Sequence, residues 1–211
     1  MRTRIKICGL TREADVDAAV AAGADAIGFV FYPKSPRYVS PERAAELARR
    51  IPPFITVVAL FVNASRDDIQ AVLDKVPVGL LQFHGDEPES ECRSWPIPYI
   101  KAARVRPGMD LVQYAIDFGS ARGILLDAFV EGFGGGGQTF DWSMIPVQMP
   151  RPMVLSGGLN AANVGEAVRR LRPPAVDVSS GVEADKGIKD AAKIAAFIAA
   201  VRAADQQAED A

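Results

Sequence analysis

Short apolar runs and amphipathic stretches alternate along the whole chain. Runs such as Val-Val-Ala-Leu-Phe at residues 57–61 combine aliphatic and aromatic residues, which is typical of buried strands. The pattern predicts eight such strands, at residues 4–7, 26–29, 56–61, 79–82, 99–103, 123–127, 153–156 and 176–179.

The stretches between these runs carry apolar residues at helical spacing. Three of them are preceded by side chains that commonly cap helices: Thr11 before the first, Ser40 before the second, and Asn63 or Ser65 before the third. We expect helices at residues 12–22, from 41, after 63 or 65, and at 88–93, 110–116, 161–171 and 190–201.

Strands joined by helices run parallel, because a crossover helix returns the chain to the same end of the sheet. Eight units predict an α/β fold, a (β/α)8 TIM barrel. It would be one compact domain over residues 1–203, although the chain of 211 residues is shorter than the typical barrel of about 250. An open doubly wound sheet is the alternative, but its G-x-G-x-x-G fingerprint is absent after the first strand. The acidic tail at residues 204–211 is expected to be disordered.

Composition argues against several classes of protein and partner. The formal net charge is −2 and Lys and Arg are spread along the chain, so we expect no nucleic-acid partner. No apolar run approaches the roughly 20 residues of a membrane span, and no signal peptide is indicated. Two cysteines, Cys8 and Cys92, and one histidine favour neither a disulfide framework nor a zinc site. These features predict a cytoplasmic protein without a metal. A monomer and a homodimer are both compatible with the pattern.

The βα loops of a barrel open on one face, and active sites lie there. Two glycine-rich turns follow the last two strands, Gly157-Gly158 and Ser180-Gly181, where backbone N–H groups can approach a phosphate. The alternative is that both are tight turns without a ligand. A run of four glycines, residues 134–137, follows the sixth strand and is a candidate for a mobile lid over the same group.

Two further strand ends carry groups that can move a proton. Asp127 ends an apolar run, and partial burial favours the protonated form that a general acid needs. Cys8 is the matching base, although a thiol with a pKa of about 8.5 needs a cation or transfer within the substrate complex to act near neutrality. The alternative for Cys8 is a small core residue. A cysteine hydrolase would require a paired histidine, and His84 lies on the fourth unit.

Other polar positions have two readings each. Arg37 can clamp a carboxylate with its planar guanidinium or can be a solvated loop residue. His84 can line the aromatic end of a substrate or serve as a hydrogen-bonded structural residue. Strand alternation places Lys6 inside the barrel below Cys8, where we expect it to pair with Asp177 or another inward acid. Gln82 and Lys101 are expected in the same polar layer.

Motifs on six units occur in an order that matches a known family. They are residues 6–11 (KICGLT), 35–37 (SPR), 82–87 (QFHGDE), 140–142 (FDW), 156–159 (SGGL) and 179–183 (SSGVE). Together they resemble phosphoribosylanthranilate isomerase, a (β/α)8 enzyme family of tryptophan biosynthesis, over residues 4–201.

The resemblance implies an Amadori rearrangement that converts N-(5-phosphoribosyl)anthranilate to 1-(2-carboxyphenylamino)-1-deoxyribulose 5-phosphate without a cofactor. Asp127 would be the acid that opens the ribose ring, Cys8 the base at the sugar C2, and Arg37 the ligand of the anthranilate carboxylate. The phosphate of this small-molecule substrate would fall to the loops after strands six, seven and eight, which contain Gly135, Gly136, Gly157, Gly158, Ser180 and Gly181.

Two departures concern the sixth loop. The family usually has Gly-Gly-Thr-Gly where this chain has glycine throughout residues 134–137, and Ala128 replaces a usual serine. Two other functions stay open from the sequence. One is the histidine-pathway aminoaldose isomerase, which resembles a catalyst with paired aspartates and a half-chain repeat. The other is a phosphate-binding barrel without catalysis.

Overall fold

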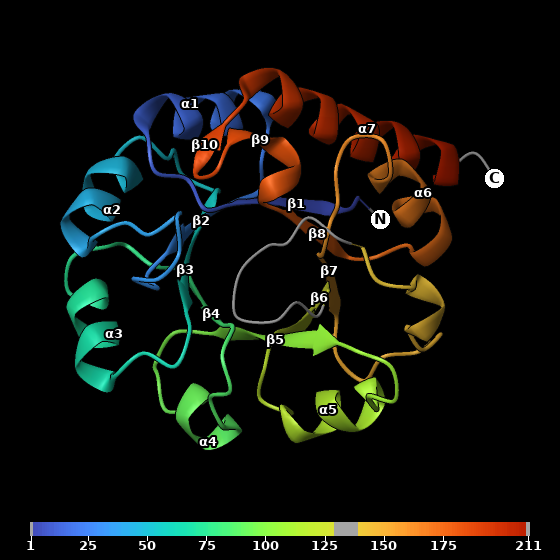
Figure 1. Cartoon of the computed structure of the whole chain (residues 1–211), viewed down its shortest axis with the longest axis horizontal. Helices are drawn as coiled ribbons and strands as arrows, with labels where there is room; N and C mark the ends of the chain where they lie inside the picture. The colour runs from blue at the N-terminus through green and yellow to red at the C-terminus, as the bar shows by residue number, and fades with distance from the viewer. Residues whose placement is uncertain (1, 129–138, 210–211) are drawn as a thin grey trace.

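Eight parallel strands close into a barrel in the computed structural model, which describes residues 2–128 and 139–209 (Figure 1). Strand β1 pairs with both β2 and β8, so the sheet has no edge, and the open-sheet alternative is wrong. The strands are β1 Arg4–Cys8, β2 Ala26–Val30, β3 Thr56–Phe61, β4 Leu80–Phe83, β5 Tyr99–Val105, β6 Gly123–Ala128, β7 Met153–Leu155 and β8 Ala175–Val178.

Helices surround the barrel as an outer ring (Figure 1). The Ser40 and Ser65 side chains cap two of them by accepting hydrogen bonds from the backbone N–H groups of Arg43 and Asp68, which settles the start of the third helix. The helices are α1 Glu13–Ala22, α2 Pro41–Ala48, α3 Arg66–Leu73, α4 Glu89–Cys92, α5 Leu111–Asp117, α6 Val164–Leu171 and α7 Ala191–Glu209. In the described part of the β6–β7 connection the helical element is the 3₁₀ turn η1, Trp142–Met144.

Alternate residues of each strand divide the core into two regions. Outward-facing aromatic residues fill the space between barrel and helices: Phe61 stacks on Phe31 with ring centroids 5.5 Å apart and lies 6.5 Å from Phe83. Each buried phenylalanine contributes about 1.5–3 kcal/mol. Inside the barrel, the lower layers are apolar, with Ile100, Ala102 and Leu125 in one cluster. The strands are thus held firmly below and outside the polar residues at their carboxyl ends.

A buried ion pair lies between β1 and β8. The Lys6 Nζ donates to Asp177 Oδ1 at 2.8 Å, and the two residues are register partners across the closing strands. The predicted pairing is confirmed. Gln82 is also fully buried, but Lys101 is not part of this layer, because the alternation that turns Ile100 and Ala102 inward turns Lys101 outward. Lys101 instead contacts Glu87 at 2.8 Å and the ring of Phe118.

An antiparallel hairpin interrupts the βα repeat after β8. The 3₁₀ turn η2, Ser180–Val182, leads into β9 Glu183–Asp185, which pairs with β10 Ile188–Lys189. The Thr11 hydroxyl donates to the carbonyl of Gly187 at 2.8 Å and therefore does not cap α1, whose N-cap residue is Arg12. The sequence pattern predicted the cap at Thr11 because it did not predict the hairpin.

The C-terminal segment is helical where we expected a disordered tail from residue 204. Helix α7 continues to Glu209 and lies beside α1 and α6 (Figure 1). Ala204 is buried, and the Asp205 carboxylate accepts hydrogen bonds from the backbone N–H of Thr3 at 2.9 Å and from its hydroxyl at 2.6 Å. These contacts order the segment because they join the last helix to the start of β1. Residues 210 and 211 lie outside the described part of the chain.

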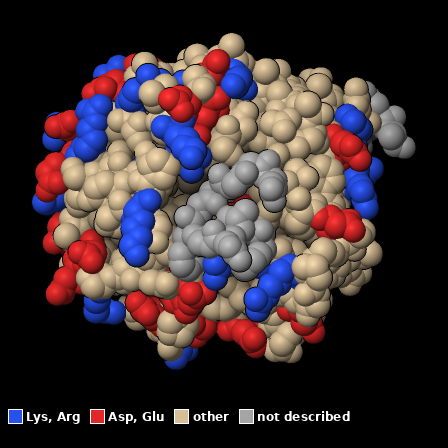
Figure 2. All heavy atoms as spheres, in the orientation of Figure 1, with Lys and Arg blue, Asp and Glu red and all other residues tan. Residues whose placement is uncertain are grey.

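The surface shows both signs of charge. Lys and Arg side chains alternate with Asp and Glu around the edge of the face drawn in Figure 2. Within residues 2–128 and 139–209, none of the helices has the length and apolar character required to span a bilayer.

Replacing Asp205 with alanine tests the contact between the last helix and the first strand. The change leaves two donors of the buried Thr3 without acceptors, so we expect the free energy of unfolding to fall by about 1–3 kcal/mol. Urea denaturation measures it. The exposed neighbour Gln206, replaced with alanine, serves as the control and should change stability little. Equal stability of the two variants would contradict the anchoring role of Asp205.

Candidate active site

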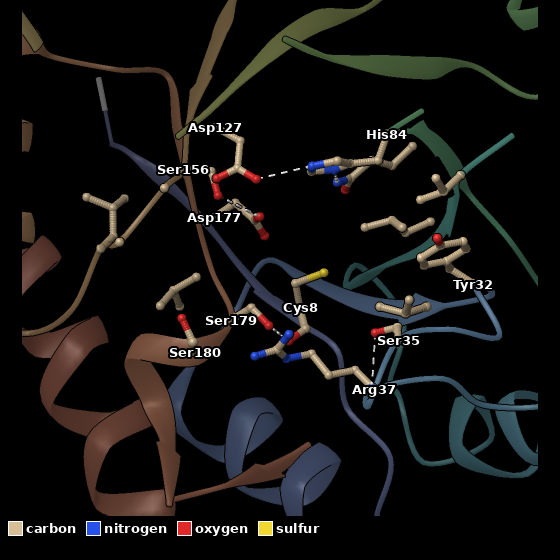
Figure 3. Close-up of a pocket in the computed structure, with 18 residues that line it drawn as sticks. Cys8, Tyr32, Ser35, Arg37, His84, Asp127, Ser156, Asp177, Ser179 and Ser180 are labelled. Atoms are coloured by element: carbon tan, nitrogen blue, oxygen red, sulfur yellow. Dashed lines mark hydrogen bonds and ion pairs between the residues drawn. The ribbon is translucent and has the colours of Figure 1, made fainter. Parts of the chain in front are cut away.

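A cavity of about 710 Å³, including its open mouth, lies at the carboxyl ends of the strands (Figure 3). Most of the described candidate residues line it: Cys8, Arg37, His84, Asp127, Gly157, Gly158 and Ser180. Gly181 is adjacent in the chain to Ser180 but is not among the lining residues. Gly135 and Gly136 lie outside the described residues. The topology therefore brings side chains from distant parts of the sequence to one opening.

Asp127, near the end of β6, is oriented by two hydrogen bonds. Its Oδ1 accepts from the backbone N–H of Ala128 at 2.9 Å, and its Oδ2 lies 3.1 Å from His84 Nε2. The other ring nitrogen of His84, Nδ1, lies 2.9 Å from the Gln82 amide nitrogen, so the imidazole bridges the Gln82 amide and the Asp127 carboxyl. The arrangement places a partly exposed carboxyl at the cavity wall with a fixed orientation (Figure 3).

The loop that carries His84 is held from behind by a fully buried ion pair. Lys101 Nζ donates to Glu87 Oε2 at 2.8 Å and to the carbonyl of Gly85 at 2.6 Å. Glu87 also accepts from the backbone N–H groups of Gly85 at 2.9 Å and of Asn63 at 2.8 Å. Removing either partner would leave an uncompensated buried charge, which is strongly destabilising. Lys101 therefore supports the site from outside the barrel.

Cys8 ends β1 with its thiol buried at the floor of the cavity. Burial raises the pKa of the Cys8 thiol, and the Lys6 ammonium opposes this rise, while the carboxylate of Asp177 adds to it. The side chains of Lys6 and Cys8 both pack against Gly28. A methyl group at Gly28 would lie 3.0 Å from the Cys8 sulfur and 3.1 Å from the Lys6 Nζ. The thiol thus has a cation beside it that favours the thiolate, but burial outweighs this effect and the pKa of the thiol stays above its ordinary value.

Arg37 is buried, with 7% of its surface exposed, so it is not a solvated loop residue. Its Nε and Nη2 donate to the two carboxylate oxygens of Glu183 at 2.7 and 2.8 Å. Lys189 Nζ lies 2.9 Å from Glu183 Oε1. Burial alone would raise the pKa of Glu183, but the Arg37 hydrogen bond and the Lys189 charge outweigh it, so the pKa of this carboxyl is lowered.

The glycine-rich turns after β7 and β8 pack directly on each other. A side chain at position 181 would place its Cβ 1.9 Å from the Leu159 carbonyl oxygen, which only glycine avoids. Gly157 and Gly158 adopt positive φ angles of 79° and 63°, and their backbone N–H groups donate to no acceptor within the described part of the chain. The packing explains the turns, and N–H donors without an acceptor among the described residues are suited to binding an anion.

Glu183 and Lys189 are the functional candidates that sequence reasoning missed. Both come from the hairpin, which a β-turn signal, Asp185-Lys186-Gly187, marks in the sequence. Within the described residues, no group of three or more His, Cys, Asp and Glu side chains is arranged to hold a metal ion.

Comparisons with known proteins agree on one family. The family model described as N-(5'phosphoribosyl)anthranilate (PRA) isomerase matches residues 5–200. A relative of that name from Dechloromonas aromatica (strain RCB) is 68% identical over 206 residues, which cover 98% of this chain and 99% of the relative.

Solved structures give the same result. Phosphoribosyl anthranilate isomerase in complex with reduced 1-(o-carboxyphenylamino)-1-deoxyribulose 5-phosphate is 43% identical with a TM-score of 0.85, over 95% of this chain and 99% of that one. A structure of monomers of the dimeric enzyme from Thermotoga maritima is 41% identical with a TM-score of 0.83, over 95% and 98% of the two chains. The chain therefore belongs to the N-(5'-phosphoribosyl)anthranilate isomerase family.

Proposed function

We propose that this chain catalyses the Amadori rearrangement of N-(5-phosphoribosyl)anthranilate in tryptophan biosynthesis, with Asp127 as general acid and Cys8 as general base. The observation that carries the proposal is that these two groups, from strands β6 and β1, line one cavity (Figure 3). Membership of the family and the relative that binds a reduced product analogue support it.

The acid step begins at the ribose ring. Asp127 protonates the ring oxygen, the bond from that oxygen to C1 breaks, and the lone pair of the aryl nitrogen forms a Schiff base with C1. The hydrogen bonds from Ala128 and His84 fix the carboxyl group and still leave lone pairs on its oxygens for the transferred proton. We therefore assign His84 the task of orienting Asp127, in addition to lining the cavity.

The base step takes the proton from C2. The Cys8 thiolate accepts this proton, the electron pair of the C2–H bond forms a double bond between C1 and C2, and the π pair of the C1–N bond moves to nitrogen. The resulting enolamine tautomerises to the ketone. The iminium itself is the electron sink, so the reaction needs no cofactor. Lys6 favours the thiolate through its positive charge, and Asp177 holds Lys6 in place.

The two charged ends of the substrate would be held by different groups of the opening. Arg37 binds the anthranilate carboxylate, and the backbone of Gly157, Gly158, Ser180 and Gly181 binds the phosphate, together with Gly135 and Gly136 of the sixth loop. The free N–H groups of Gly157 and Gly158 support the phosphate assignment.

The proposed role of Cys8 also bears on where the protein is located in the cell. A cytoplasmic location is proposed because Cys8 must stay a free thiol to act as a base, and both cysteines are free. Sedimentation distinguishes a monomer from a homodimer.

Activity of Cys8→Ala and Asp127→Ala tests the two roles. Substrate is generated in place from anthranilate and phosphoribosyl pyrophosphate with the preceding transferase, and anthranilate-type fluorescence is followed. Each variant should lose about 10²- to 10⁴-fold in kcat, because general acid–base groups contribute that much. Cys92→Ala removes the other buried thiol, which is remote from the cavity, and should keep most of the activity.

The outcomes of this assay separate the alternatives. Turnover that is unchanged in Cys8→Ala or Asp127→Ala would keep the reaction and overturn the assigned role. No turnover by the unmodified chain, with the transferase working, would point to the histidine-pathway substrate or to a phosphate-binding barrel without catalysis.

The pH dependence of Cys8 alkylation tests the environment of the base. The reactive form is the thiolate, and its fraction falls as pH drops below the thiol pKa; a raised pKa therefore moves the rise in reactivity to higher pH than for free cysteine. Iodoacetamide labelling of Cys92→Ala protein, followed by mass spectrometry, measures it. Lys6→Met should move the rise further toward alkaline pH. Alkylation as fast as that of free cysteine at pH 7 would contradict this environment.

A further inference from the structure

The hairpin of residues 183–189 is an insertion with contacts that fix its position. It lies next to α1 and β1 (Figure 1). The Thr11 hydroxyl donates to the Gly187 carbonyl at 2.8 Å, and the backbone N–H of Lys189 donates to Asp15 at 3.2 Å. Asp15 is in turn paired with Arg12 at 2.6 Å. The hairpin is therefore tied to the first βα unit, next to Cys8.

The hairpin binds one edge of the Arg37 guanidinium through Glu183. Glu183 takes the Nε and Nη2 hydrogens in a bidentate pair at 2.7 and 2.8 Å. No acceptor for Nη1 lies within the described part of the chain. The side-chain stem is fixed as well, since a methyl group at Gly9 would lie 2.6 Å from Arg37 Cδ. Arg37 thus has one edge occupied, and the rest of its planar head lines the cavity (Figure 3).

The cluster formed by Arg37, Glu183 and Lys189 carries an excess of positive charge. Lys189 Nζ contacts the Glu183 carboxylate at 2.9 Å, the Ser179 carbonyl at 2.9 Å and the Ser179 hydroxyl at 3.3 Å, all of which accept hydrogen bonds from an ammonium group. Two cations therefore share one carboxylate. The other nearby acids are already paired, Asp15 with Arg12 and Asp177 with Lys6. A buried net charge is costly without a counterion, and a ligand carboxylate supplies one.

We propose that Glu183 and Lys189 are specificity-determining positioning residues: Glu183 aims Arg37 into the cavity, and Lys189 keeps the cluster net positive, so that the site selects arylamine substrates with an ortho carboxylate. This inference rests on the proposed function, in which Arg37 binds that carboxylate. It adds that Arg37 alone does not give the selectivity. The Ser179 hydroxyl, which donates to the Cys8 carbonyl at 3.1 Å, links the cluster to the strand end that carries the base.

Two ligands that differ only in the ortho carboxylate measure how much this group contributes to binding. Reductive amination of ribose 5-phosphate with anthranilate or with aniline gives two stable amines that differ only in that group. Titration calorimetry measures the dissociation constant of each, and their ratio is the selectivity. A variant that is merely less stable weakens both ligands alike and leaves the ratio unchanged.

Two variants of the hairpin should lower the ratio for different reasons. Glu183→Asp keeps the charge but shortens the reach by one methylene, so the bidentate pair with Arg37 is lost. Lys189→Met keeps the length but removes the excess positive charge. We expect each to reduce the selectivity about tenfold, mainly by weakening the anthranilate-derived ligand, with the aniline-derived ligand changed less than about twofold.

A surface pair provides the matched control. Glu13 also binds an arginine in a bidentate pair, accepting from Nη1 and Nη2 of Arg43 at 2.6 and 2.7 Å, and it does not line the cavity. Glu13→Asp should therefore keep the ratio of the unmodified chain. Arg37→Ala should abolish selectivity. If it does not, the proposed role of Arg37 fails. If Arg37→Ala abolishes it while Glu183→Asp and Lys189→Met keep it, the inference is overturned and the proposed function stands. Should Glu183→Asp fail to fold, Lys189→Met decides.

Discussion

The ion pair between Lys6 and Asp177 is the contact on which the rest of this barrel depends. It joins the first and last strands at the level where the apolar interior ends and the polar mouth begins. A lysine ammonium inside a barrel is costly unless it is paired, so the register between these strands is set by charge as well as by hydrogen bonds. The same ammonium lies beside the Cys8 thiol, so one group serves both the closure of the fold and the environment of the proposed base.

Buried ionic groups support the other cavity residues in the same way. The pair of Lys101 and Glu87 holds the loop of His84, and Glu183 with Lys189 holds Arg37. Such pairs add little net stability compared with well-packed apolar residues, but they fix direction, because a charge with the wrong geometry loses its compensation. The cavity residues are therefore oriented from behind, by charged residues that do not themselves line the cavity.

Much of this structure was predictable because its signals are local or repeat along the chain. The alternation of apolar runs and helices predicted the barrel, and the strand period placed Lys6 opposite Asp177. The errors have three different causes. Lys101 was predicted to lie inside, but its direction depends on which alternate residues of β5 face inward, and these are Ile100 and Ala102. The tail was predicted to be disordered because its contact with Thr3 joins residues far apart in the chain. The hairpin was missed, and Glu183 and Lys189 with it, because its strands are too short for a periodic pattern.

The closing pair also has a consequence for how the protein is made. Lys6 and Asp177 are separated by 171 positions, so during synthesis Lys6 leaves the ribosome long before its partner exists. Contacts of such high sequence separation form late and slowly. A nascent or truncated chain that ends before β8 has no counterion for Lys6 and no hairpin to hold Arg37. The thiol is the first of the proposed groups to be synthesised, yet its electrostatic environment is complete only after β8 has been made, which couples acquisition of activity to completion of the barrel.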